Sequence, residues 1–225
     1  MERETILNEA RRWVGYTESN YCDYLEYDSQ QGGHGKNNYN RFSWIFDKML
    51  SPKVYAGGNK DGYAWCATFV ATCIGTCDFV AKNHLVHEIV AAPVAMLAEM
   101  RRCYCSNLDI ALGLKGTPLA SASMLAGVSS YPHFTNIQPT TYEKAKPADL
   151  IIFGDNAHIG FVEAIGEGKL VTIEGNTKCG SPTPNGGEVC RKLYVINGAG
   201  LIELRNGQRL KSWDKFKLYK TLIIK

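Results

Sequence analysis

The residue best placed for chemistry is Cys66, which stands at the start of a run of small and apolar residues. Residues 57–62 are rich in glycine, asparagine and aspartate, which favours turns, whereas residues 67–77 contain no proline and predict a buried helix. Cys66 would lie in the first turn of that helix, where free backbone N–H groups and the helix dipole stabilise an anion. A thiol in such a place ionises below its usual pKa of about 8.5 and becomes a usable nucleophile. The alternative interpretation is a buried structural cysteine.

A histidine, a glutamate and an asparagine follow in two β-patterned runs joined by a glycine-containing turn, which predicts a hairpin. If the turn centres on Gly166, His158 pairs with Glu174; if it centres on Glu167, His158 pairs with Asn176. In either register the three polar side chains project from one face of the hairpin. The other face would carry apolar side chains that pack on a core, namely Ile159, Phe161, Ile165, Val171 and Ile173.

These side chains have the types that amide cleavage needs. The thiolate of Cys66 would attack the amide carbon, and His158 would take the thiol proton and return it to the leaving amine. Glu174 would orient the imidazole and fix its tautomer, while Asn176 would replace or assist Glu174 or polarise the substrate carbonyl. The backbone N–H of Cys66 would stabilise the oxyanion, and the sequence does not identify a second donor. Taken singly, these residues are equally typical of turns and solvated strand ends.

Four segments together resemble the motifs of CHAP domains, the cysteine, histidine-dependent amidohydrolases/peptidases. Trp65–Val70 is similar to the nucleophile motif of that family, and Asp149–Phe153 and His158–Gly160 are similar to its histidine strand. Ile173–Thr177 resembles its Glu-Gly-Asn motif. Order and rough spacing agree along most of the chain, with a departure at residues 79–118. Local cysteine-protease signatures do not transfer between families, so the combination carries the resemblance.

The resemblance implies an α+β, papain-like fold, with N-terminal helices packed on a C-terminal antiparallel β-sheet. It also implies a peptidoglycan hydrolase, which we expect to be an N-acetylmuramoyl-L-alanine amidase, with a stem or cross-bridge endopeptidase as the alternative. The expected site consists of the catalytic residues Cys66, His158, Glu174 and Asn176, with Tyr63 and Trp65 as substrate-binding residues.

The ends and the apolar runs of the chain bear on where such an enzyme would work. The N-terminus shows no apolar run suited to a signal peptide, and no stretch approaches 18 apolar residues. We therefore expect no membrane span, synthesis in a host bacterial cytoplasm, and action on the wall after release, as in a phage endolysin. A secreted antibacterial amidase toxin, a non-catalytic wall-binding module and a cytoplasmic thiol peptidase remain open.

Composition indicates one globular domain over residues 1–225, without a separate wall-binding domain. Apolar residues make up 45% and charged residues 21% of the chain, an ordinary balance for a folded domain. The net charge of +3 suits approach to an anionic wall, and the dispersed Lys and Arg do not indicate nucleic acid. Residues 79–118 are expected to be an insertion, with a cap over the cleft, a dimer face and a partner-binding surface as the alternatives for its role.

We expect no cofactor and no metal. Asp23, Asp28 and Asp61 offer oxygen ligands for calcium, but their spacing is not that of a calcium loop. Solvated carboxylates are therefore the favoured interpretation, with calcium kept as an alternative.

The eight cysteines show no zinc-binding spacing. Cys73 and Cys77 fall on the same helical stripe as Cys66 and are expected to be small core residues. Cys179 and Cys190 bracket a loop rich in glycine and proline, and could form a disulfide outside a reducing cytoplasm.

The remaining patterns predict secondary structure around the site. Helices are expected at residues 2–14, 39–50, 86–100 (ending at Arg101-Arg102) and 121–127, strands at 188–196 and 217–224, and a hairpin at 201–210 turning at Asn206-Gly207.

Overall fold

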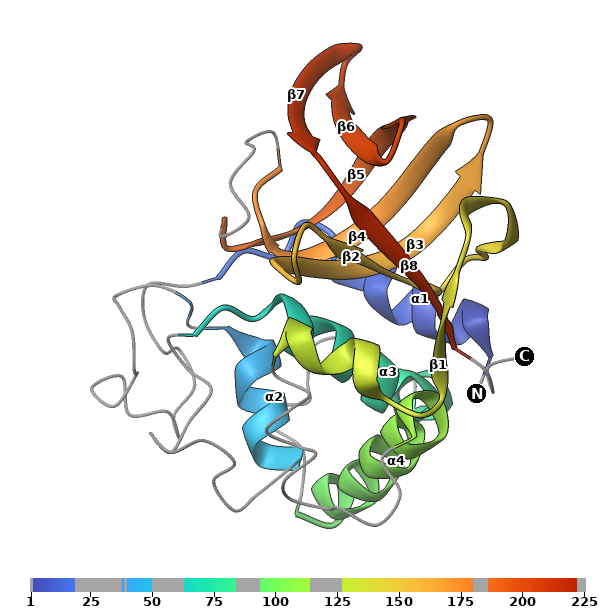
Figure 1. Cartoon of the computed structure of the whole chain (residues 1–225). Helices are drawn as coiled ribbons and strands as arrows, with labels where there is room; N and C mark the ends of the chain where they lie inside the picture. The colour runs from blue at the N-terminus through green and yellow to red at the C-terminus, as the bar shows by residue number, and fades with distance from the viewer. Residues whose placement is uncertain are drawn as a thin grey trace.

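A computed structural model describes residues 2–18, 38, 40–49, 63–83, 94–113, 127–179 and 186–221. Within these residues, α-helices gather on one side of a single antiparallel sheet (Figure 1), which confirms the α+β class. The helices are α1 (Arg3–Arg12), α2 (Arg41–Met49), α3 (Cys66–Asn83) and α4 (Val94–Leu112), with 3₁₀ turns η2 (Val128–His133) and η3 (Tyr142–Lys144).

The sheet has eight strands in the order β1-β8-β2-β3-β4-β5-β6-β7. Every neighbouring pair is antiparallel, and the consecutive strands from β2 to β7 are each hydrogen-bonded to the next. The strands are β1 (Ile137–Thr140), β2 (Leu150–Phe153), β3 (His158–Gly166), β4 (Lys169–Thr177), β5 (Glu188–Asn197), β6 (Gly200–Arg205), β7 (Gln208–Trp213) and β8 (Phe216–Thr221).

Helix α3 is the centre of the helical layer. It contacts α1, α2 and α4 on its sides and strands β3 and β4 of the sheet. Its side chains from Cys66 to Cys77 are buried, as a run of small apolar residues without proline predicts, and Cys73 and Cys77 lie in the core as expected. Gly75 allows α4 to pack closely, because a Cβ there would lie 2.3 Å from the ring of Tyr104.

An aromatic cluster fixes the beginning of α3. The indole of Trp65 stacks on Phe42 of α2 with ring centroids 5.1 Å apart, and Phe42 meets Phe69 edge-on at 5.0 Å. All three side chains are fully buried, and each such burial contributes about 2 kcal/mol of hydrophobic free energy. The Tyr131 hydroxyl also donates to the carbonyl of Ala67 at 2.8 Å. The first turn of α3 is therefore held from several sides.

Helix α4 runs further than the sequence predicts. It continues through Arg101 to Leu112, whereas the basic pair at residues 101–102 was expected to end it. The guanidinium of Arg101 donates to the carbonyls of Lys48 and Met49 at the end of α2, so the charge serves an interhelical contact. Buried side chains, including Tyr104, then continue the apolar stripe.

Most of the other described elements agree with the sequence patterns, but strand β1 was not predicted, since residues 131–146 were expected to be a loop. Helices α1 and α2, strands β5 and β8, and the β6–β7 hairpin lie where they were expected, and the hairpin turns at Asn206 and Gly207 with φ of 49° and 77°. The part of residues 79–118 that is described forms the end of α3 and helix α4, which packs on α3 and α2. The helix expected at residues 121–127 and the start of that expected at 86–100 lie outside the described residues.

The β3–β4 hairpin has a two-residue turn at Glu167 and Gly168. Both residues have positive φ, 52° and 70°, as a type I′ turn requires, and the strands pair Gly166 with Lys169. Neither Gly166 nor Glu167 is the centre of the turn, so both predicted centres were wrong. The cause is that a tight two-residue turn is centred between residues.

A β-bulge at Glu163 then shifts the register of this hairpin. Ala164 pairs with Val171 on one side of the bulge, and Val162 pairs with Thr172 on the other. The extra residue in β3 shifts the partners in β4 by one position. On the side of the bulge away from the turn, the strands therefore pair as they would around a turn centred on Glu167. The bulge also turns Ile165 to the second apolar cluster, away from Ile159 and Phe161, contrary to the prediction of one shared face.

Two arginines hold the side chain of Glu163. The Nε–H of Arg11 in α1 donates to its carboxylate at 2.8 Å, and the guanidinium of Arg191 in β5 donates to both oxygens at 2.5 and 2.8 Å. The contacts hold the pKa of Glu163 low despite its partial burial, which raises it. Through these hydrogen bonds the bulge is tied to helix α1 and to strand β5.

We expect Glu163→Ala to lower the free energy of unfolding by about 2 kcal/mol, because it removes charge-assisted hydrogen bonds at a mostly buried carboxylate. Urea unfolding followed by circular dichroism measures the change. Glu2→Ala, at an exposed residue without a side-chain cap, is the control and should shift stability by less than about 0.5 kcal/mol. Equal effects of the two variants would contradict the role of Glu163.

Candidate active site

Cys66 is the first residue of α3, as its sequence context predicts. The first helical hydrogen bond runs from the Phe69 N–H to the Trp65 carbonyl at 2.8 Å, so the N–H groups of the first turn remain available to an anion. The Cys66 side chain is 5% exposed. The thiol therefore lies at the positive end of a buried helix dipole.

His158 is the first residue of β3 and faces Glu174 of β4. Its Nε2 lies 3.0 Å from Glu174 Oε2, and both side chains are 1% exposed. The neighbouring strand supports the ring, since Phe153 pairs with His158 and its ring centroid lies 5.5 Å away. The hairpin thus brings the predicted imidazole and carboxylate into direct contact.

Nδ1 is the ring nitrogen of His158 that remains for the thiol. It is buried and is not in hydrogen-bonding geometry with any residue that the structure describes. The interaction with Cys66 nevertheless affects both groups, as their pKa values show. In free enzymes such catalytic hydrogen bonds are often long or poorly aligned and tighten when substrate binds.

The pKa values of Cys66 and His158 move in opposite directions. Burial raises the pKa of the Cys66 thiol, but its interaction with His158 and the N–H groups of Ile159 and Ala67 lower it below its ordinary value. Burial lowers the pKa of His158, but its contacts with Cys66 and Glu174 outweigh this and raise it to about 9. The lowered thiol pKa and the raised imidazole pKa both favour a thiolate beside an imidazolium over the neutral pair.

Glu174 is held by more groups than the sequence analysis foresaw. Its Oε1 accepts from the Thr172 hydroxyl at 2.5 Å and from the Tyr194 hydroxyl at 2.9 Å. The Lys192 ammonium lies 4.0 Å from Oε2 and 3.2 Å from Glu203. Burial raises the pKa of Glu174, but His158, Lys192 and Thr172 together keep it below its usual value.

A sequence signal for these additional groups existed in the alternation of β5. Thr172 pairs with Lys192, and Glu174 pairs with Cys190, so the even-numbered residues of β4 and β5 share one face. Lys192 and Tyr194 are two residues apart in the largely buried strand β5, so their side chains point to that face. The pairing of β4 with β5 had to be known before this signal could be used.

Asn176 does not contact the imidazole nitrogen that Glu174 holds. It has a φ of 56° at an irregularity of β4, it is 1% exposed, and its Oδ1 has no hydrogen-bond partner among the described residues. Glu174 therefore takes the orienting position, and Asn176 stays a predicted member of the site. A buried amide oxygen without a partner is costly unless a water or ligand satisfies it.

Gly175 explains how the sheet reaches the first turn of α3. A Cβ at this position would lie 2.6 Å from Cβ and Cγ of Phe69. Only a glycine lets β4 approach the first turns of α3 so closely, and Glu174 and Asn176 are its two neighbours in β4. The glycine between the two polar residues is thus required by packing.

Trp65 is fully buried, which argues against its predicted contact with substrate. Its indole N–H donates to Glu18 at 2.8 Å, and its ring packs on Phe42 and Tyr16. In this conformation its side chain supports Cys66 from within the core. Tyr63 is half-buried, and its role as a substrate-binding residue stays a prediction.

The pKa directions predict the pH dependence of Cys66 reactivity. The thiolate should exist above the lowered pKa of Cys66, and the imidazolium below about 9. Alkylation by iodoacetamide should therefore begin at lower pH than for an ordinary thiol and change again near pH 9, as His158 loses its proton. Mass spectrometry of the Cys66 peptide measures the rate at each pH.

Cys105 provides an internal control in the same samples. It is exposed, and partial burial raises its pKa, so it should react only under alkaline conditions. Identical profiles for Cys66 and Cys105 would show that Cys66 is an ordinary thiol.

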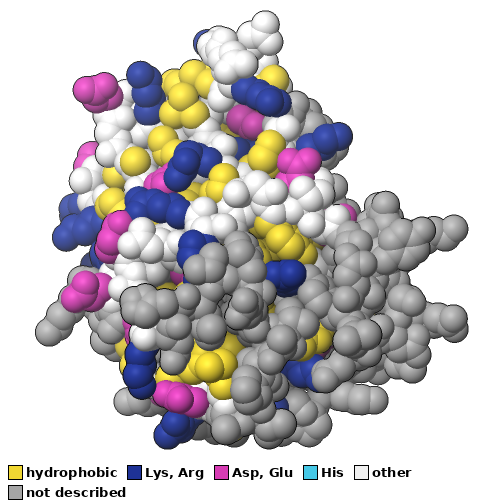
Figure 2. Space-filling view, turned by 180° about the vertical axis from the view of Figure 1, so that it is seen from behind, with side chains coloured by type: hydrophobic (Ala, Val, Ile, Leu, Met, Phe, Trp, Pro, Cys, Tyr) yellow, Lys and Arg dark blue, Asp and Glu magenta, His cyan; other side chains and the backbone are white. Residues whose placement is uncertain are grey.

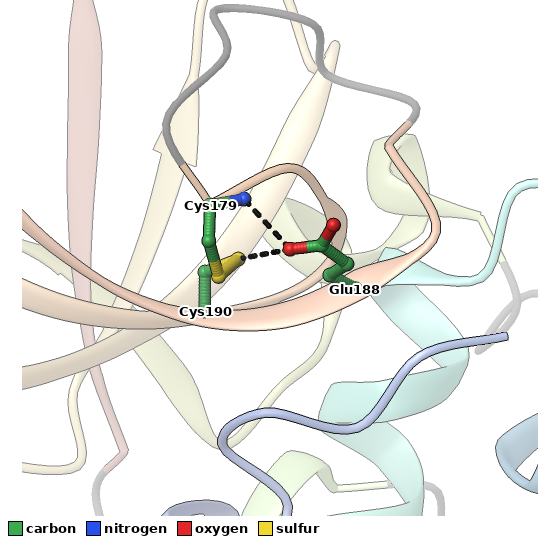
Figure 3. Close-up of side chains that lie close together, drawn as sticks. All are labelled: Cys179, Glu188 and Cys190. Carbon is green, nitrogen blue, oxygen red and sulfur yellow. Dashed lines mark hydrogen bonds between the residues drawn. A yellow bond between two sulfur atoms is a disulfide. The ribbon is translucent and has the colours of Figure 1, made fainter.

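Cys179 and Cys190 form a disulfide next to the site (Figure 3). It joins the end of β4 to β5, and Cys190 is the residue that pairs with Glu174. Glu188 lies alongside, where its Oε2 accepts from the Cys179 N–H at 3.0 Å and lies 3.7 Å from the sulfur of Cys190. The disulfide therefore links the residue just after β4, three positions beyond Asn176, to strand β5.

The same three residues are the described group whose ligand atoms are close enough for a metal, within 4.8 Å of one another. Both sulfurs are in a disulfide, so neither is a thiolate ligand. The carboxylates Asp23, Asp28 and Asp61, considered for calcium, lie outside the described residues.

Opening the disulfide should destabilise the protein. The bridge spans 11 positions, and a loop of this length corresponds to about 3 kcal/mol in the chain-entropy account. Cys179→Ala should therefore lower the Tm by about 6–12 °C in calorimetry. Cys105→Ala, at an exposed free cysteine, should leave the Tm unchanged. A Tm that is the same in Cys179→Ala and wild type would contradict the prediction.

The surface shows a mixed charge. On the face seen in Figure 2, Lys and Arg side chains are scattered among acidic and apolar ones. No described helix is long and apolar enough to cross a membrane. No family model matches the chain, and neither does any curated protein or solved structure.

Proposed function

We propose that this protein is a thiol hydrolase of the CHAP type that cleaves amide bonds of bacterial peptidoglycan, with papain-like placement of its catalytic groups. The observation that carries the proposal is the arrangement around His158. One ring nitrogen is held by a buried carboxylate, the other is left for a cysteine whose pKa is lowered, and that cysteine begins a helix packed on an antiparallel sheet.

The geometry supports a two-step mechanism. The Cys66 thiolate attacks the amide carbon, and the C–N bond breaks as the imidazolium of His158 gives its proton to the leaving amine, which leaves a thioester. Neutral His158 then takes a proton from water, whose hydroxide attacks the thioester and releases the carboxylic acid and the thiolate. Glu174 holds Nε2–H throughout, so that Nδ1 is the nitrogen that exchanges protons.

The first candidate for the bond is the amide between N-acetylmuramic acid and L-alanine, with a stem or cross-bridge peptide bond as the alternative. The choice between them rests on the product and is built into the experiment below. A secreted antibacterial amidase toxin is a further alternative. It would cleave the same wall by the same chemistry, but it would be delivered by another bacterium.

A wall-binding module without catalysis is the weaker reading. His158 and Glu174 are fully buried, and burying an ion pair is generally no gain in stability over apolar packing. A module that only binds has no need of a thiol with lowered pKa beside this pair. The electrostatic arrangement is what catalysis requires.

The proposed place of action is the cell wall, after release from a host bacterial cytoplasm. The Cys179–Cys190 disulfide supports a working environment outside a reducing cytoplasm, because glutathione and thioredoxin keep most cytosolic thiols reduced.

The proposal predicts that wild type solubilises purified peptidoglycan and that Cys66→Ala does not, with a loss of activity of at least about 1000-fold because the attacking thiolate is removed. Loss of turbidity gives the rate, and mass spectrometry of the products names the bond. A new L-alanine amine indicates an amidase, and a new stem or cross-bridge amine indicates an endopeptidase.

Two controls accompany this experiment. Cys105→Ala removes a free cysteine away from the site and should keep full activity. Casein is the matched protein substrate, and its cleavage in place of the wall would favour a cytoplasmic thiol peptidase. If wild type and Cys66→Ala both bind walls and both leave them intact, the catalytic proposal fails.

A further inference from the structure

A buried ion pair stands directly behind Glu174. Lys192 of β5 and Glu203 of β6 lie 3.2 Å apart, and their side chains are 6% and 4% exposed. The same ammonium is 4.0 Å from the Glu174 oxygen that contacts His158. Lys192 therefore lies between two carboxylates, one of which belongs to the proposed catalytic site.

We propose that Lys192 and Glu203 are positioning residues of the site, whose ion pair keeps Glu174 ionised and fixed on His158. The inference rests on the proposed function, in which Glu174 orients the imidazole. Neither residue contacts the reacting atoms, so both act through Glu174.

The balance of buried charge supports this role. Among the described residues, the titratable groups facing Glu174 are His158 from β3, Lys192 and Tyr194 from β5, and Glu203 from β6, with Cys66 of α3 beyond His158. When Cys66 is a thiolate, the cations His158 and Lys192 face three anions, the other two being the carboxylates of Glu174 and Glu203. Transfer of a proton from His158 to Cys66 leaves the net charge of this cluster unchanged.

Removing either member of the pair would disturb that balance in opposite directions. Without Lys192, Glu174 and Glu203 would be neighbouring buried carboxylates, which cannot both ionise readily. Without the charge of Glu203, Lys192 would present an unpaired cation to Glu174 and His158. The first change favours protonation of Glu174, and the second disfavours the imidazolium.

Hydroxyl groups complete the fixation of Glu174. Tyr194 and Thr172 both donate to Oε1, which leaves Oε2 to His158 and Lys192. Burial and the charges of Glu174 and Glu203 raise the pKa of Tyr194 well above its ordinary value, so its hydroxyl stays protonated and remains a donor. Each carboxylate oxygen therefore has its own partners.

The test is the titration of His158 by NMR in ring-labelled protein, with its resonance assigned from a His158→Ala spectrum. The resonance reports the loss of the His158 proton near pH 9 and, at acid pH, the protonation of the adjacent Glu174. Lys192→Met should raise the pH of the acid step by about one unit or more. Glu203→Gln should lower the alkaline step by about one unit.

The double variant Lys192→Met/Glu203→Gln removes both charges, and because Lys192 is the cation next to Glu174, the acid step should stay above its wild-type pH while lying below that of Lys192→Met. Lys217→Met, at an exposed strand lysine, is the control and should move neither step. If the pair is only structural, each single variant lowers the Tm while the His158 titration stays at its wild-type pH values, and the proposal is overturned.

Two features keep the test decisive. Glu203→Gln is isosteric, so the alkaline step can be measured even if Lys192→Met does not fold. The titration needs no substrate, so it is separate from the wall assay. Shifts of the expected sign in a protein that leaves every wall intact would support the ion-pair role, while the proposed wall-cleaving function would fail by itself.

Discussion

The extra residue in β3 is the constraint on which the candidate site depends. The Glu167-Gly168 turn pairs residues whose numbers sum to an odd value, and in a regular hairpin this would place His158 and Glu174 on opposite faces. The bulge at Glu163 changes the parity, so that both side chains reach one face and come within 3.0 Å. The arginines that hold Glu163 therefore help to fix the bulge on which the His158–Glu174 contact depends.

The other half of the site comes from the helical layer, and packing sets its position. Trp65, Phe42 and Phe69 enclose the first turn of α3, and Gly175 lets β4 meet that turn at van der Waals distance. Neither half is a flexible loop. A thiol and an imidazole on two rigid elements keep their separation, which in the proposed reaction would avoid an ordering cost at each turnover.

Much of this arrangement was predictable from the sequence, because local patterns determine it. The start of α3 follows from turn formers before Cys66 and apolar residues after it. The common face of His158 and Glu174 was also predicted, but from turn centres that the structure does not have, and it depends on the bulge at Glu163. The turn position and the bulge were not predictable in this way, since a one-residue shift leaves the pattern of apolar residues almost unchanged. Lys192 and Glu203 were missed because their role depends on pairings between β4, β5 and β6 that no local pattern encodes.

The burial of so many charges in one place needs a physical reason. Each ionised group in this cluster would be costly alone, and the cluster is tolerated because cations and carboxylates alternate through His158, Glu174, Lys192 and Glu203. Such an alternation is more than a stable core needs, since apolar residues of similar volume would pack as well. It is suited to a proton that must move between Cys66 and His158 with little change in the surrounding field, because the donors and charges around Glu174 are already in place before the proton moves.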